Sequence, residues 1–163
     1  MKAPLGSGES GVGNREWGIG SGESGVGNRE WGIGSGCSVE ENVEPIESYR
    51  DLRVWQAGMC LAKACYLLTR RFPREELFGL TSQIRRAASS IPANIAEGNG
   101  RENTGDYIQF LRIAQGSLKE LETHLLLSQE VDVTEKEEIS PLLAEATALG
   151  KMLRSLIRSL QRR

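Results

Sequence analysis

The sequence lacks most of the features by which membrane proteins and disulfide-rich proteins are recognised. Its 163 residues contain no apolar run of about 18 residues, which a membrane-spanning helix needs. Three cysteines, an odd number without a CxxC pair, argue against a disulfide framework and a cysteine zinc site. The start of the chain has no apolar signal core, so we expect a cytoplasmic protein that does not enter membranes.

Histidine is scarce as well, which argues against a metal centre. The lone histidine, His124, follows Glu120 by four residues on one face of an expected helix. A di-iron bundle needs Glu-x-x-His on two helices, whereas Leu121 stands three residues before His124. A solvated Glu–His pair is the expected arrangement. The sequence also lacks a nucleophile elbow and a Walker-type loop, so we expect no catalytic residues, no metal, no cofactor and no enzymatic activity.

An excess of charge of either sign is also missing. The chain has 20 basic and 22 acidic residues, for a net charge of −2, and residues 38–163 alone have 17 and 18. This balance argues against a histone-like arm or a bulk polyanion binder, although a local basic patch remains compatible with it.

Glycine is present in excess, and its distribution divides the chain. Twelve of the 19 glycines lie in residues 1–37, where residues 6–19 (GSGESGVGNREWGI) are repeated letter for letter at 20–33. This composition buries too little apolar surface to offset backbone ordering, so it predicts a disordered tail. Trp17 and Trp31 could make the tail a tandem docking peptide, but an inert tail is the favoured interpretation. We expect an acidic linker over 38–47 and a folded domain over 48–163.

From Ser48 onward the apolar spacing is helical throughout. It predicts an all-α fold, an antiparallel up-down-up-down four-helix bundle with short connections. The expected helices span about 48–72, 74–97, 104–130 and 134 to the C-terminus. Gly116 and Ser117 in the third helix predict a close approach to a neighbouring helix.

Local signals predict how these helices begin, bend and end. Thr104 is the expected N-cap of the third helix, and Thr134 with Glu137 forms an expected capping box for the fourth. Pro92 removes a backbone hydrogen bond and so predicts a kink in the second helix. Gly98 is the expected left-handed cap at its end.

The first helix carries two apolar stripes about 120° apart. One stripe comprises Leu52, Trp55, Met59, Ala62 and Tyr66, and the other comprises Val54, Gly58, Leu61, Cys65, Leu68 and Phe72. One stripe can face the bundle while the other faces a neighbouring subunit. We expect the second stripe to form the oligomer interface, because exposing it would create a large apolar patch.

The second helix carries a polar stripe comprising Gln83, Arg86, Ser90, Asn94 and Glu97. It could present hydrogen-bonding groups to a ligand or partner. It could instead be structural, with Ser90 satisfying the backbone near Pro92 while Asn94 and Glu97 pair with Arg112 or Gln109 of the third helix. We favour the structural role, because a kinked helix leaves carbonyls that need partners.

Two groups of basic residues are candidates for contact with nucleic acid. They are Arg70, Arg71, Arg74, Arg85 and Arg86, and a C-terminal group of Lys151, Arg154, Arg158, Arg162 and Arg163. No acid follows Glu145, so the last helix ends as a basic segment. The helix dipole alone could explain why basic residues gather at the C-terminal end of this helix. Alternatively, a ring of subunits would gather these segments into a rim that contacts phosphates.

Three segments of the domain resemble one protein family. Residues 80–101 (LTSQIRRAASSIPANIAEGNGR) resemble the core signature of the 23S ribosomal RNA intervening-sequence proteins. Residues 106–125 (DYIQFLRIAQGSLKELETHL) and 49–68 (YRDLRVWQAGMCLAKACYLL) extend the resemblance. The resemblance implies a four-helix bundle similar in fold to the accessory protein of diversity-generating retroelements, a pentamer that binds nucleic acid and a reverse transcriptase.

By this resemblance we expect a homo-oligomer, a pentamer, whose partner is structured RNA or a nucleic-acid-processing protein. The alternative is a structural module that binds protein partners through the polar stripe of the second helix, without nucleic acid. Salt dependence discriminates between them, because phosphate contacts make affinity fall steeply with salt.

Overall fold

The computed structural model describes residues 47–162. The predicted tail (1–37), the predicted linker apart from Glu47, and Arg163 lie outside the described residues. No helix in the described part of the chain is long and apolar enough to cross a membrane.

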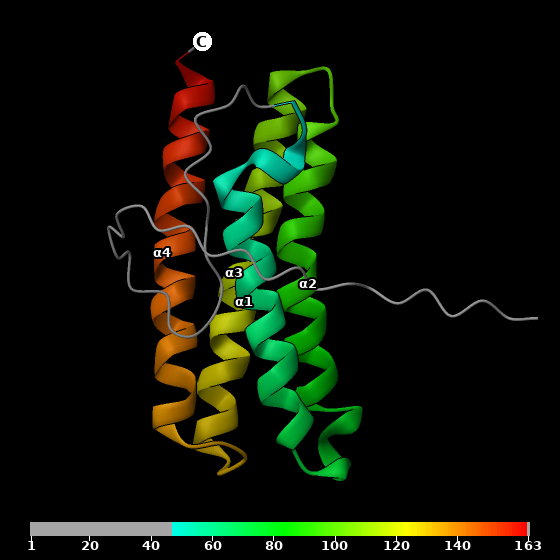
Figure 1. Ribbon diagram of the computed structural model, residues 1–163, viewed down its shortest axis with the longest axis vertical. Coiled ribbons are helices and arrows are strands. Elements are labelled where there is room, and N and C mark those ends of the chain that lie inside the picture. Colours follow the sequence, from blue (N-terminus) through cyan, green and yellow to red (C-terminus); the bar gives the residue numbers. More distant parts are fainter. Residues whose placement is uncertain (1–46, 163) are drawn as a thin grey trace, which may run out of the picture. The chain divides into compact units, whose positions relative to one another are not determined.

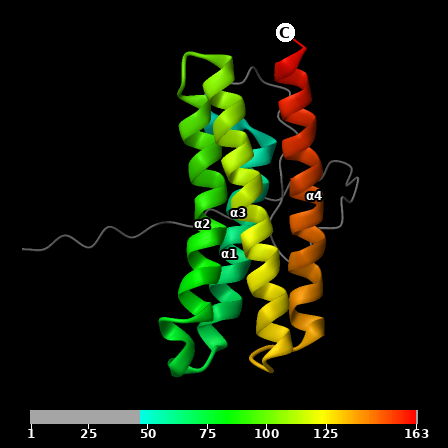
Figure 2. The same ribbon diagram turned by 180° about the vertical axis from the view of Figure 1, so that it is seen from behind.

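Four long helices make up the described part of the chain, which contains no strand. They are α1 (Arg53–Leu68), α2 (Leu80–Asn99), α3 (Thr104–Glu130) and α4 (Lys136–Gln161). Helices α1 and α3 each pack against both α2 and α4, and the most extensive contact joins α2 to α3. Figures 1 and 2 show successive helices running in opposite directions, joined at the ends of the bundle by short connections. The prediction of an all-helical, four-helix fold is confirmed.

The first helix is shorter than predicted because the chain turns at Leu52. Ser48 and Asp51 form a capping box around a single 3-10 turn, η1 (Tyr49–Asp51). Leu52 is extended (φ −71°, ψ 116°), and α1 begins after it. At its other end α1 tightens into a second 3-10 turn, η2 (Thr69–Arg71), before reaching Phe72.

The second helix begins six residues later than predicted. A separate 3-10 turn, η3 (Arg74–Leu77), comes first, and Gly79 (φ −94°, ψ −122°) interrupts the helix. The Glu76 carboxylate then accepts a hydrogen bond from the Leu80 amide at 2.9 Å, which satisfies one of the free N–H groups of the new helix. Helix α2 continues through Pro92 to Asn99 as one element.

The expected role of Gly98 is wrong. Helix α2 ends at Asn99, and its C-cap is Gly100 in a right-handed conformation (φ −77°, ψ 0°). Gly98 is buried inside the helix, where a Cβ atom would lie 2.7 Å from Phe110 Cβ and 2.8 Å from Tyr107 Cδ2. Glycine is needed there because α2 and α3 approach closely.

Gly116 does not have the role expected of it either, since a Cβ atom at this position would meet nothing within 4 Å. Its neighbour Ser117 does lie at the junction of α2 and α3, with its hydroxyl 2.9 Å from that of Ser90. At Gly58 a Cβ atom would lie at an ordinary contact distance of 3.6 Å from atoms of Ile91 and Pro92, which places α1 against the middle of α2.

The caps of α3 and α4 are each displaced by one residue from their predicted positions. Asn103, not Thr104, caps α3 by accepting a hydrogen bond from the Gly105 amide at 2.7 Å. The capping box of α4 consists of Glu135 and Glu138. The Thr134 hydroxyl instead donates to the Glu138 carboxylate at 2.6 Å. In both cases a neighbouring polar side chain competes to cap the unpaired backbone N–H groups of the first helical turn.

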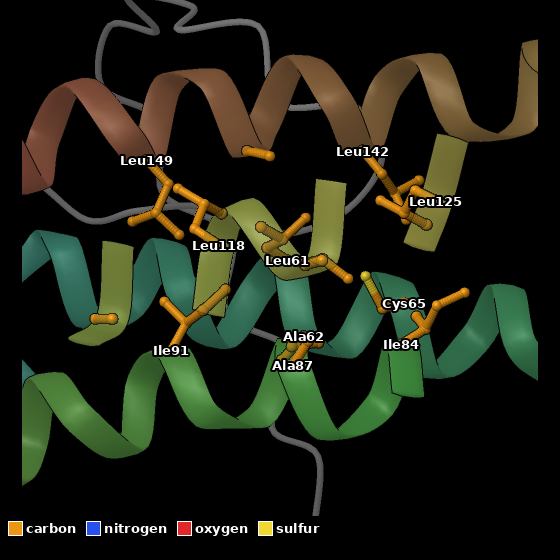
Figure 3. Packing of buried hydrophobic residues seen from close by; sticks show 14 of the residues in the cluster. Leu61, Ala62, Cys65, Ile84, Ala87, Ile91, Leu118, Leu125, Leu142 and Leu149 are labelled. Atoms are coloured by element: carbon orange, nitrogen blue, oxygen red, sulfur yellow. The ribbon is translucent and has the colours of Figure 1, made fainter. Parts of the chain in front are cut away.

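The core lies between the four helices, and it contains the stripe of α1 that we assigned to an oligomer interface. Val54, Leu61, Cys65 and Leu68 are buried in the main apolar cluster, and Phe72 is partly buried against it. Figure 3 shows Leu61 and Cys65 among side chains of the other three helices, such as Ile84, Leu118 and Leu149. The interface assignment is therefore corrected, because these side chains are already covered within one chain.

The other stripe of α1 is the less buried one. Met59 and Tyr66 are 45% and 43% exposed, whereas Leu52 and Trp55 are partly buried and Ala62 is buried. The stripe assigned to an interface therefore packs in the core, and the other stripe is the one with exposed side chains.

Candidate nucleic-acid interface

The structure separates the basic candidates into two regions at opposite ends of the bundle. Lys151, Arg154, Arg158 and Arg162 belong to the last part of α4 and its C-cap. Arg70, Arg71 and Arg74 lie in the connection between α1 and α2, at the far end in Figure 1. Arg85 and Arg86 follow in the first half of α2. These residues do not form a single patch.

The α4 basic stripe consists of Lys151, Arg154, Arg158 and Arg162. All four side chains are exposed, and their spacing of three and four residues aligns them along one face of the helix. An open depression on this face is lined by the four cations together with Ser155 and Ser159. Leu149, Leu153 and Ile157, which alternate with them in sequence, are buried in the core. The stripe therefore faces away from the bundle.

The charges of the stripe are not neutralised within the described residues. The ion pairs found between residues 47 and 162 join other side chains, and none of them uses a cation of the stripe. The acids of α4 are confined to its beginning and middle, ending at Glu145. This arrangement complements the helix dipole, which contributes about 0.3–1 kcal/mol per charge within the last turn. Lys151 and Arg154 lie beyond the reach of that effect, more than one turn before the helix ends.

The arginines at the other end are largely engaged with the protein itself. Arg71 forms an ion pair with Glu138 at 2.6 Å, which ties η2 to the first turn of α4. Arg85 donates to the Thr69 hydroxyl at 2.8 Å, and its guanidinium lies 5.0 Å from the centre of the Tyr66 ring. Arg70 and Arg74 remain exposed. This region offers fewer free cations than the α4 basic stripe.

The polar stripe of α2 lies along the junction with α3, and its side chains bond mainly to one another and to α3. Arg86 pairs with Glu120 of α3 and donates to Gln83 at 2.9 Å. The Ser90 hydroxyl lies 2.9 Å from that of Ser117, and the Asn94 amide donates to the Ser90 carbonyl at 2.8 Å.

These partners differ from the expected ones. Asn94 bonds to its own helix, and Glu97 pairs with Arg101 at 2.5 Å rather than with Arg112 or Gln109. Ser90 uses its hydroxyl to join α2 to α3 instead of satisfying the backbone near Pro92.

His124 and Glu120 do form a pair on α3, but a partly buried one. Their Nε2 and Oε1 atoms are 3.8 Å apart, and the Glu120 carboxylate is shared with Arg86. No group of three or more histidine, cysteine, aspartate or glutamate side chains within the described residues is arranged to hold a metal ion.

Two residues of the depression on α4 were missed by the sequence reasoning. Ser155 and Ser159 alternate with the cations and lie on the same face. Each follows a cation of the stripe by one residue, so a helical wheel places both hydroxyl groups beside Arg154 and Arg158.

Comparison with known proteins identifies the family. The sequence profile of the 23S rRNA-intervening sequence proteins matches residues 50–155. The chain belongs to this family. The match spans all of α1, α2 and α3 and most of α4, including Lys151 and Arg154 of the basic stripe.

A solved structure from the same group supports the fold. It is a protein of unknown function from the S23 ribosomal protein family of Bacteroides thetaiotaomicron, 28% identical, with a TM-score of 0.60. The similarity covers 64% of this chain and 97% of that protein. No match was found among curated proteins.

Proposed function

We propose that this member of the 23S rRNA-intervening sequence protein family is a non-enzymatic, homo-oligomeric bundle that binds RNA through its α4 basic stripe. The observation that carries the proposal is a row of four exposed cations without a carboxylate partner among the described residues. Arginine suits this role because its planar guanidinium bonds phosphate oxygens with two N–H groups and stays charged. The family's association with ribosomal RNA supports RNA as the ligand.

The polar stripe of α2 offers weaker support for the alternative, a protein-interaction module without nucleic acid. Arg86 and Ser90 are bonded to α3, and Glu97 is paired with Arg101. A protein partner would have to replace these bonds, whereas phosphate would meet cations on α4 that have no competing acid. This difference favours RNA.

Self-association requires a different surface from the one first expected. Since Leu61 and its neighbours are buried in the core, the candidates are exposed apolar side chains of α1 and α3. They are Met59, Tyr66, Leu67, Ile113, Leu126 and Leu127. We propose that copies associate through such side chains, with five copies as the resemblance implies. Light scattering that finds a monomer at micromolar concentration would contradict this part of the proposal.

The test of RNA binding uses two double variants with equal loss of charge. Arg158→Gln with Arg162→Gln removes two cations of the α4 basic stripe, and Arg70→Gln with Arg74→Gln removes two exposed cations at the other end. All four positions are exposed, so neither change opens a cavity. In filter binding at low salt, we expect the α4 variant to lose affinity about tenfold, equivalent to about 1.4 kcal/mol. The matched control should change much less, and an equal loss in both variants would refute the proposed location.

A further inference from the structure

The α4 basic stripe is long enough to lie along several base pairs of a nucleic-acid duplex. Lys151 and Arg162 are eleven residues apart on a continuous helix and its cap, which corresponds to roughly 16 Å along the axis. A duplex carries about one phosphate per 1.7 Å of axis when both strands are counted. A segment as long as the stripe therefore presents about nine phosphates, and the stripe can contact those that the two strands turn toward it.

The chemistry of the stripe suits a sugar–phosphate backbone better than unpaired bases. Proteins that hold single strands usually add aromatic side chains on which the bases stack. Helix α4 contains no aromatic residue, and the depression on its outer face is lined only by cations and serines.

Exposed aromatic rings elsewhere in residues 47–162 do not supply such a stacking surface beside α4. Phe78 is 89% exposed, but it lies between η3 and α2, at the end of the bundle far from the C-terminus (Figure 1). The Tyr66 ring is faced by the guanidinium of Arg85. At the end where α4 finishes, the rings of Tyr49 and Trp55 pack edge-to-face against each other, with centroids 5.3 Å apart.

Ser155 and Ser159 add hydroxyl groups between the cations. Each hydroxyl is both donor and acceptor, and neither forms a side-chain hydrogen bond within the described residues. The ribose 2′-hydroxyl has the same dual capacity and lies in the shallow minor groove of an A-form helix, where duplex RNA is recognised. The serines therefore match a feature that DNA lacks.

From these observations we infer that the α4 basic stripe binds the backbone of double-stranded RNA, in preference to single-stranded RNA. This inference rests on the proposed function. It predicts recognition by shape and charge with little dependence on base sequence, because contacts to phosphate and ribose carry no sequence information.

The experiment compares three labelled probes by fluorescence anisotropy with the full chain. They are an RNA duplex of roughly 16 base pairs, one of its strands alone, and the DNA duplex of the same sequence. We expect the RNA duplex to bind about tenfold more tightly than the single strand at equal salt. Ser155→Ala with Ser159→Ala should reduce binding of the RNA duplex about twofold or more and leave DNA binding unchanged.

The outcomes separate the two proposals. A single strand that binds as tightly as the duplex, and is still weakened by Arg158→Gln with Arg162→Gln, overturns the preference for duplex but leaves RNA binding by α4 intact. RNA binding that this arginine variant does not alter overturns the proposed function itself. Equal affinity for the RNA and DNA duplexes, unaffected by the serine variant, overturns the role of the hydroxyl groups.

Discussion

Two glycines on neighbouring helices should respond in opposite ways to the same substitution. Alanine is favoured over glycine inside a helix by about 1 kcal/mol, since glycine loses more backbone freedom on folding. At Gly116 nothing lies within 4 Å of the added Cβ, so Gly116→Ala should stabilise the protein by about that amount. At Gly98 the Cβ would lie 2.7 Å from Phe110 Cβ and 2.8 Å from Tyr107 Cδ2.

Carbon atoms pack at about 3.5–4.0 Å, and the Phe110 Cβ atom moves only with its backbone, so Gly98→Ala must push α2 and α3 apart by up to about 1 Å. Overpacking of this kind costs about 1–3 kcal/mol, against the propensity gain of about 1 kcal/mol. We therefore expect a net loss of up to about 2 kcal/mol.

Urea unfolding followed by circular dichroism measures both changes in the free energy of unfolding. Gly100→Ala is the control, because the nearest neighbour of its Cβ would be the Glu97 carbonyl oxygen at 3.5 Å. The reasoning is refuted if Gly98→Ala stabilises the protein as Gly116→Ala is expected to, or if Gly116→Ala is less stable than the wild type.

Three further predictions concern the core. Leu61→Glu places a charge at a position that is 1% exposed, so it should abolish the helical circular dichroism signal. Met59→Glu, at an exposed position of the same helix, should still fold. Equal unfolding of both variants would contradict the assignment of Leu61 to the core. Burial raises the pKa of the Glu145 carboxyl in the folded protein. The stability that this group contributes is therefore fully present below its ordinary pKa and is lost as the pH rises through the raised pKa of the folded state. Glu145→Gln should therefore raise the melting temperature at pH 7 but not at pH 4, and equal shifts would argue against burial as the cause. Burial and, secondarily, the charge of Glu145 raise the pKa of Cys65 to about 12, so iodoacetamide at pH 8 should modify Cys65 only after unfolding, as peptide mass spectrometry would show.

The sequence predicts the helices well because their apolar spacing is strong and long. In α4 the apolar positions from Ile139 to Leu153 that share one face are buried, whereas Leu156 and Leu160, which continue the same spacing, are only partly buried. Boundaries were less predictable, because single 3-10 turns at η1 and η3 keep a helical spacing while Leu52 and Gly79 break the hydrogen-bonded helix. Periodicity alone cannot detect such breaks.

The faces of α1 show a second limit of sequence reasoning. Its two apolar stripes are equally visible in the pattern, but only the positions of α2 and α4 decide which stripe is covered. Leu61 and Cys65 became core residues, and Met59 and Tyr66 stayed exposed. The stripe on α4 was easier to predict, since a helix with one apolar seam must turn its remaining face to solvent.

The partners of the polar residues on α2 could not be predicted for a related reason. A helical wheel gives the face on which Arg86 and Ser90 lie, but not the register of the helix opposite. That register is set by packing, including the close contact at Gly98, and it brings Ser117 rather than Gln109 or Arg112 to the stripe.

The most direct test of RNA binding by α4 is the salt dependence of affinity for duplex RNA. The logarithm of the binding constant falls with the logarithm of salt concentration by about 0.9 for each phosphate contact, on the scale known for duplex DNA. Removing two contacts by Arg158→Gln with Arg162→Gln should therefore reduce the slope by about 1.8, while Arg70→Gln with Arg74→Gln should leave it unchanged. Identical slopes for the wild type and the α4 variant would contradict the account.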